Sequence, residues 1–253
     1  MIPITPSNPE RLALIGYSSK LTSSTLAPEM LTPNTYERYT PGTGAVVAKF
    51  ELGASSDIDF IAIGAHNIGT HDGGTEITVS YATTVGGALT EIESITPTDN
   101  GALFFSFDSV TAAQIAIETN ATTSGQEIGV IYTGEALQMQ QPIYGGHSPI
   151  ELSQNTTYSS SMSESGQFLG RTITRKGLET SFSWRHLDHE WYRSDFQPFA
   201  QSARTLPFFI QWRPDVTSAA AFGYTTGDIK PTNMGGGSKL MSVDLTMRAH
   251  SDV

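Results

Sequence analysis

The chain has 253 residues, with 25 acidic and 14 basic side chains and a net charge of −11. This excess of carboxylates argues against a surface that neutralises nucleic-acid phosphates or sits on anionic lipid. The chain contains no cysteine, which excludes disulfides, thiolate metal sites and cysteine nucleophiles. We therefore expect a protein stabilised by packing and assembly, without specific nucleic-acid binding, membrane insertion or a cofactor.

The composition favours a mainly β protein. The chain has 24 glycines, 13 prolines and a hydrophobic fraction of 38%, which suits many turns between short strands better than long helices. Its length allows two ordinary domains. The longest apolar runs are the length of strands and fall short of the roughly 18 to 20 residues that a membrane helix needs. No secretory signal is visible at the N-terminus, so we expect synthesis in a cytoplasm.

The charge is unevenly distributed along the chain. Residues 1–140 hold 4 basic and 15 acidic side chains, whereas residues 141–253 hold 10 of each. This change of composition coincides with a turn-rich stretch at 141–149, which suggests a domain boundary. We predict an extended arm at 1–33, an acidic β-sandwich at 34–140, and a smaller β-rich domain with one short helix at 141–253.

The first half indicates an arm followed by six strands. Four prolines before residue 33 forbid a long helix and favour an extended segment that lies on something else. Unbroken apolar runs at 59–63 and 103–107 predict central strands that are covered on both faces. The six predicted strands lie at 45–52, 57–66, 75–84, 102–108, 112–119 and 127–134.

The second half indicates a different set of elements. A polar Ser/Thr stretch at 153–166 precedes two strands that flank Lys176 and Gly177, which predicts a hairpin turning there. Asp188 is placed to cap a helix, in which Pro198 predicts a kink or two short helices. Further strands are expected at 206–212 and at 241–247.

Few side chains suggest catalysis or metal binding. His186 and His189 could direct two imidazoles at one metal, but a third ligand is missing and Asp188 is better explained as a cap. Asp57, Asp59 and Asp72 could hold Ca²⁺, although solvated loop carboxylates are the simpler interpretation. No nucleophile-elbow, phosphate-loop or dinucleotide motif is present in the sequence. We expect neither an enzyme nor a metal protein.

Two groups of residues are candidates for binding. Polar residues at the end of the 57–66 strand should tie down loop backbone, and they could instead form a glycan-side loop. Its members are His66, Asn67, His71 and Asp72. Trp, Tyr and Arg dominate protein interfaces, so an aromatic and basic group in the second half could serve assembly, or could simply be a core edged by arginines. It comprises Trp184, Arg185, Trp191, Tyr192, Arg193, Arg204, Trp212 and Arg213.

Several motifs in sequence order resemble structural proteins of phage tails. The segments LTPNTYERY (31–39), DFIAIGAHNIG (59–69) and EIGVIYTGEALQM (127–139) are similar to the galactose-binding-like jelly roll found in such tails. The segments GQFLGRTITRKG (166–177), SFSWRHL (181–187) and ARTLPFFIQWRP (203–214) resemble the hairpin, helix and strand of distal-tail or tail-tube domains.

This resemblance implies a virion structural protein that links the tail tube to the adsorption apparatus. It further implies a trimeric or hexameric ring of identical subunits, with other phage tail proteins as neighbours. Host glycan binding by the jelly roll is the alternative, although no aromatic platform for a sugar is recognisable in the sequence.

Overall fold

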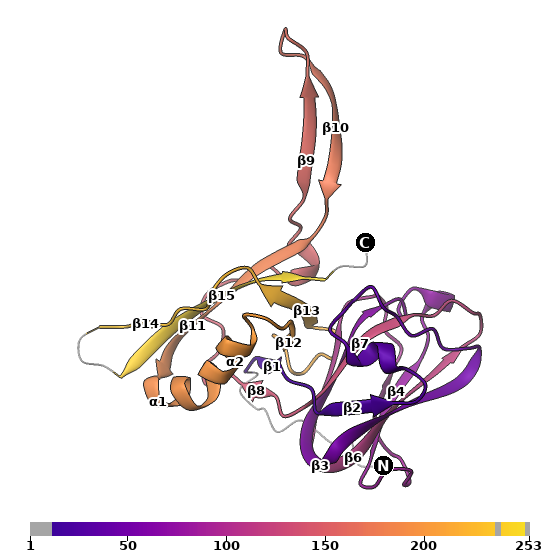
Figure 1. The fold of residues 1–253 in the computed structure, drawn as a ribbon. Coiled ribbons are helices and arrows are strands. Elements are labelled where there is room, and N and C mark those ends of the chain that lie inside the picture. The colour runs from indigo at the N-terminus through magenta and orange to yellow at the C-terminus, as the bar shows by residue number, and fades with distance from the viewer. Residues whose placement is uncertain (1–11, 236–238, 251–253) are drawn as a thin grey trace.

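The computed structural model describes residues 12–235 and 239–250, and it is mainly β (Figure 1). Two β domains lie side by side, a single helical segment covers part of the second domain, and a two-stranded ribbon projects away from both. The predicted fold class is therefore confirmed. No helix among the described residues is long and apolar enough to cross a membrane.

The first domain is a jelly-roll-like sandwich built on two long strands, β3 and β6. The first part of β3 pairs with the last part of β6. The last part of β3 pairs with the start of β6 on one side and with β7 on the other. Both long strands contain bulges, and they pass from one layer of the sandwich to the other. The sheet order is β2-β3-β6-β4-β5. The bounds are Leu21–Ser24 (β2), Gly44–His66 (β3), Ile77–Ala82 (β4), Thr90–Ile95 (β5), Leu103–Ala121 (β6) and Ile128–Gly134 (β7), with 3₁₀ turns at Pro28–Leu31 (η1) and His71–Gly73 (η2).

The second domain is a sheet into whose sequence the jelly roll is inserted. The strand order is β11-β15-β13-β12-β1-β8, with β14 on β15. In the chain, β1 comes before the jelly roll and β8 comes after it. The predicted extended arm at 1–33 therefore differs from the structure, because it supplies β1 to the second sheet and β2 to the jelly roll. Residues 1–11 of this arm lie outside the described part. The bounds are Leu14–Gly16 (β1), Leu137–Gln138 (β8), Leu178–Asp188 (β11), Phe208–Gln211 (β12), Ala220–Thr225 (β13), Thr232–Asn233 (β14) and Leu240–Ala249 (β15), with a 3₁₀ turn at Ile150–Leu152 (η3).

The helical segment begins where the sequence predicts. The Asp188 carboxylate accepts hydrogen bonds from the backbone N–H groups of Glu190 (2.7 Å) and Trp191 (3.2 Å), which confirms the cap. A π turn lies between two short α helices, and Pro198 falls in the first turn of the second, where its missing N–H is tolerated. The segment comprises His189–Trp191 (α1), Tyr192–Phe196 (η4) and Gln197–Ser202 (α2).

An apolar interface joins the two domains. Phe60 and Phe104 are fully buried and stack with ring centroids 5.0 Å apart, on the side of the sandwich that meets Phe209 and Phe222 of the second sheet. Their sequence neighbours, such as Ile61, face the sandwich core instead. The predicted double coverage of these runs is confirmed, because one face packs inside the jelly roll and the other against the second domain.

Backbone hydrogen bonds tighten the same interface. The N–H of Phe104 donates to the carbonyl of Thr217 at 2.9 Å, and the Gln211 amide donates to the carbonyl of Phe104 at 3.0 Å. Gly64 favours this close approach, because a Cβ at this position would come within 3.1 Å of the Cβ of Phe222, so that a larger residue would make the neighbouring side chain shift. The two domains are thus held in a fixed arrangement by both apolar and polar contacts.

The ribbon consists of β9 (Thr157–Met162) and β10 (Phe168–Arg175), which form a separate two-stranded sheet. It rises from the second domain in Figure 1. The predicted hairpin around Lys176 and Gly177 is wrong, because β10 pairs with β9 while β11 pairs with β15. The strand β9 lies within the polar Ser/Thr stretch at 153–166, where the sequence shows no alternation of apolar side chains that would predict a strand.

Candidate functional site

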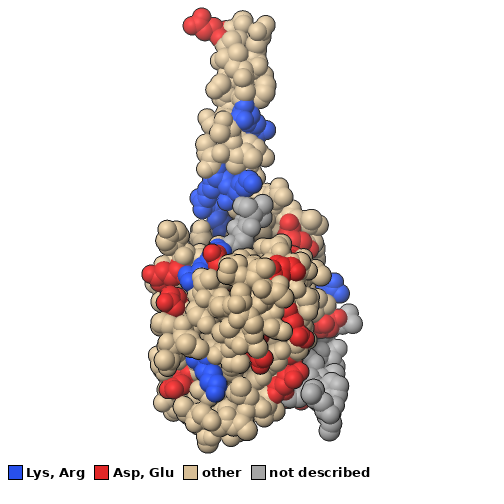
Figure 2. Space-filling model, turned by 90° about the vertical axis from the view of Figure 1, so that its right-hand side faces the viewer, with Lys and Arg blue, Asp and Glu red and all other residues tan. Residues whose placement is uncertain are grey.

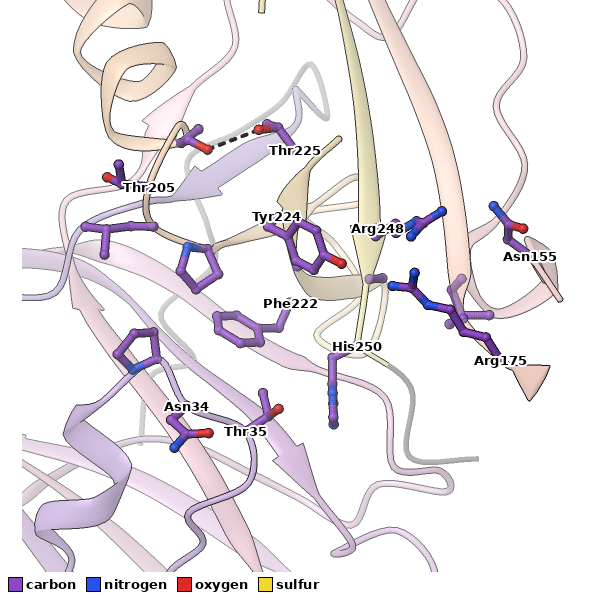
Figure 3. A pocket seen from close by; sticks show the side chains of 18 of the residues that line it. Asn34, Thr35, Asn155, Arg175, Thr205, Phe222, Tyr224, Thr225, Arg248 and His250 are labelled. Atoms are coloured by element: carbon purple, nitrogen blue, oxygen red, sulfur yellow. Dashed lines mark hydrogen bonds between the residues drawn. The ribbon is translucent and has the colours of Figure 1, made fainter. Parts of the chain in front are cut away.

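A cleft of about 600 Å³ opens where the base of the ribbon, the second sheet and one jelly-roll loop meet. The loop contributes residues 33–35, the sheet contributes residues 222–225 and 248–250, and the ribbon base contributes residues 175–178. Figure 3 shows Phe222 and Tyr224 in the middle of this cleft, with Arg175, Arg248 and Asn155 on one side and Asn34, Thr35 and His250 on another. The site therefore exists only in the folded chain.

Strand register explains the row of side chains at the cleft wall. Tyr224 on β13 is opposite Arg248 on β15, and Arg248 is opposite Glu179 on β11. Residues that are directly opposite on neighbouring strands project from the same face of a sheet. An aromatic ring, a guanidinium and a carboxylate consequently lie side by side.

Arg248 is held in place by its neighbours. Its Nε donates to Glu179 Oε2 at 2.9 Å, and the Asn155 amide donates to the same oxygen at 2.6 Å. These hydrogen bonds, from Arg248 first, lower the pKa of Glu179, and the bond to Glu179 raises the pKa of Arg248. The guanidinium is therefore permanently charged and fixed beside the Tyr224 ring.

Aromatic surface is available in and beside the cleft. Phe222 and Tyr224 are two residues apart and share a face of β13, but the jelly roll covers Phe222 and leaves Tyr224 48% exposed. The loop that lines the cleft with Asn34 and Thr35 continues into Tyr36, which is 91% exposed. The sequence pattern did not predict that the rings of Tyr224 and Tyr36 would be exposed.

The cleft is basic in an acidic protein. Its lining includes four Lys and Arg side chains and His250, and no Asp or Glu. Figure 2 shows Lys and Arg gathered at the base of the ribbon. A positive cleft attracts negatively charged ligands, and guanidinium groups pair with carboxylates in a fork geometry. The four cations are Arg175, Lys176, Arg204 and Arg248.

The residues predicted as a glycan-side loop lie at one end of the jelly roll. His66 ends β3 and is fully buried, and its ring Nδ1 accepts a hydrogen bond from the N–H of Ile68. The Asn67 amide donates to the carbonyl of Gly125 at 2.9 Å and accepts from the N–H of Glu127 at 2.8 Å. These two side chains thus hold loop backbone in place through hydrogen bonds, as the sequence predicts.

Asp72 and His71 belong to the same network. Asp72 accepts hydrogen bonds from the N–H groups of Thr122 and Thr123, each at 2.8 Å, and from both hydroxyls. The bonds from Thr123, followed by those from Thr122, lower the pKa of Asp72. His71 contacts the carbonyl of Thr123 at 3.1 Å. These contacts connect two loops, and a glycan role for the four residues stays a prediction.

The residues predicted as an interface divide into two sets. Trp184 and Tyr192 are buried in the core of the second domain, and Trp191 and Trp212 pack against that core while partly buried. The simpler interpretation, a core of aromatics edged by arginines, describes this arrangement. The arginines are exposed, and only one of them lines the cleft. They are Arg185, Arg193, Arg204 and Arg213.

The candidate metal ligands are not brought together. No group of three His, Asp or Glu side chains among residues 12–235 and 239–250 could hold a metal ion. Asp57 accepts from the Thr111 hydroxyl at 2.6 Å, and Asp59 accepts from the N–H of Ala136 at 2.7 Å. Asp188 serves as the helix cap beside His189.

The comparisons with known proteins found likeness of fold only. No family model and no curated protein matches the chain. One similar structure is a pectin-binding carbohydrate-binding module, 18% identical, covering 46% of this chain and 92% of that one, at a TM-score of 0.39. Another is the CBM32 of AlyQ in complex with 4,5-unsaturated mannuronic acid, at 17% identity, 44% and 92% coverage, and a TM-score of 0.38.

A third similar structure is chitosan-binding module 1 of a chitosanase/glucanase from Paenibacillus sp. IK-5. It is 14% identical, covers 47% of this chain and 98% of that one, and has a TM-score of 0.38. These distant likenesses concern about half of the chain. The jelly-roll part of the sequence prediction agrees with the sheet topology, and the tail-protein part stays a prediction.

Proposed function

We propose that this protein is a non-catalytic carbohydrate-binding protein, and that an acidic glycan occupies the cleft beside Tyr224. The observation that carries the proposal is the row of Tyr224, Arg248 and Glu179 across three strands, next to Arg175 at the base of the ribbon. Sugar rings offer C–H faces that pack on aromatic side chains, and hydroxyls that exchange hydrogen bonds with amides.

The basic lining selects among glycans. A uronate carboxylate gains from a guanidinium that is already oriented, because little conformational entropy remains to be lost on binding. Arg248 is already paired with Glu179 and Arg204 with Asp228. A uronate therefore adds a further carboxylate to these cations, whereas a neutral sugar adds no charge to the cleft. The amides of Asn34 and Asn155 lie on two sides of the cleft and are suited to ring hydroxyls.

Calorimetric titration of the full chain with polygalacturonate, alginate and neutral dextran tests this proposal. We expect saturable binding of the uronate polymers, weakened by salt because the Debye length shrinks, and no measurable binding of dextran. Tyr224→Ala and Arg175→Gln should each weaken binding by at least about tenfold, which corresponds to about 1.4 kcal/mol.

Arg193→Gln is the matched control, because Arg193 is exposed and lies outside this cleft. It changes the net charge as Arg175→Gln does, and it should leave binding unchanged. Equal losses in the two variants would show that only overall charge matters. Failure of every acidic glycan to bind would overturn the proposal.

The second candidate function is the structural role expected from the sequence, in which the protein is part of a phage tail tip within a virion. The observation in its favour is the projecting β9–β10 ribbon, which has the form of an assembly element. Copurification with tail particles from infected cells would test it. A protein that is never incorporated into particles would contradict it.

A further inference from the structure

The β9–β10 ribbon has one apolar face and one polar face. Residues that are directly opposite in an antiparallel pair share a face, and Tyr158 is opposite Ile173 while Met162 is opposite Phe168. All four are therefore on one face. The other face carries Ser, Thr and Gly along most of its length, with Ser159 opposite Thr172 and Ser161 opposite Gly170, and Arg175 opposite Thr157 at its base.

The apolar face is open to solvent in the single chain. Met162 is 66% exposed and Phe168 is 67% exposed, although both are large apolar side chains. Tyr158 and Ile173 are about half exposed, and Arg171 lies over the Tyr158 ring at 3.3 Å from its centroid. An exposed apolar patch of this kind on a projecting element is typical of a protein interface.

The ribbon also needs a partner for its own stability. An isolated two-stranded ribbon is at best marginally stable in water, and three strands or a covering surface are normally required. Here the two strands form their own sheet, separate from those of both domains. A surface that covers the apolar face would supply the missing layer.

Charge indicates what that surface belongs to. Residues 153–178 contain Arg171, Arg175 and Lys176 but only one acidic side chain, Glu164, so the ribbon region carries +2 in a chain of −11. Residues 1–140, most of which form the jelly roll, carry 4 basic against 15 acidic side chains, or −11. A ribbon from one chain and a jelly roll from another are therefore complementary, whereas two jelly rolls repel each other.

We propose that the apolar face of the ribbon docks onto the jelly roll of a second copy of this chain. The contact joins two different surfaces of identical subunits, so in a pair one subunit keeps a free jelly roll and the other keeps a free ribbon. Such a head-to-tail contact produces a closed ring when the rotation between subunits closes, and a filament otherwise. The proposal does not require a glycan in the cleft, although Arg175 and Lys176 contribute both to the cleft lining and to the charge of the ribbon region.

Sedimentation and native mass spectrometry of the full chain provide the first test. We expect concentration-dependent oligomers that dissociate as ionic strength rises from about 0.05 M to about 0.5 M, because the attraction is screened. The double variant Met162→Ser with Phe168→Ser should raise the dissociation constant at least tenfold. A chain that is monomeric at every concentration would overturn the proposal.

The opposite face of the ribbon supplies the control. Ser159→Gln with Ser161→Gln adds bulk to the polar face of the same strand, and it should leave the dissociation constant within twofold of the parent. An equal loss from both double variants would mean that the ribbon matters only through its folding, which contradicts a docking face.

Cross-linking identifies the occupant directly. A photoreactive side chain at position 162, in a mixture of isotopically heavy and light chains, should give heavy–light products that end within residues 44–134. The same probe at position 161 should give few. Cross-links that end in the second domain, or only within one chain, would overturn the assignment to the jelly roll of a second copy.

Discussion

At the scale of a residue, Asp59 is a carboxyl group whose burial disfavours its charged form. It lies on β3 near the junction of the two domains, and burial raises its pKa to about 6 although the N–H of Ala136 donates to it. The folded protein therefore holds this proton up to about pH 6, whereas the unfolded chain releases it near pH 4. Stability should fall as the pH rises through this window.

Asp59→Asn tests that relation. The amide oxygen can still accept from Ala136 but carries no charge, so the variant should gain about 2 kcal/mol over the parent between pH 4 and pH 7. Urea unfolding at the two pH values measures the difference. A difference between parent and variant that does not change with pH would contradict the raised pKa.

At the scale of an element, the helical segment depends on the cap at Asp188. Asp188→Ala removes an acceptor for two backbone N–H groups and should lower the Tm by about 2 to 4 °C. Asp188→Asn keeps a good capping oxygen and should stay within about 1 °C of the parent. Scanning calorimetry of both variants makes the comparison. A similar loss in both would assign the effect to charge rather than to capping.

At the scale of the whole molecule, the interface between the domains should make them unfold together. Phe209 is fully buried and contacts Tyr132 of the jelly roll and Phe222 of its own sheet, with ring centroids 5.4 and 4.6 Å apart. Phe209→Ala should destabilise the protein by about 3 to 5 kcal/mol and keep a single transition.

Leu152→Ala is the control for this prediction, because Leu152 is 73% exposed and its truncation should change little. Calorimetry with separate spectroscopic probes of the two domains distinguishes the outcomes. If Phe209→Ala lowered only the transition of the second domain, the domains would be independent.

The sequence predicted individual strands better than their partners. The alternating final strand, the Asp188 cap and the doubly covered runs in β3 and β6 all follow from local patterns of side chains. The strand β5 was missed because its alternating residues include two glutamates, and β9 was missed because it is almost wholly Ser and Thr. Apolar periodicity cannot indicate strands whose faces are polar.

Composition and local pattern by themselves determined the mainly β class, the absence of thiol chemistry and the acidic first half. Only the tertiary structure decided that the jelly roll is inserted between β1 and β8, and that Tyr224, Arg248 and Arg175 meet in one cleft. The physical reason is that the register between distant strands depends on which faces they bury against each other. A single sequence records each strand's faces but not the neighbour that covers them.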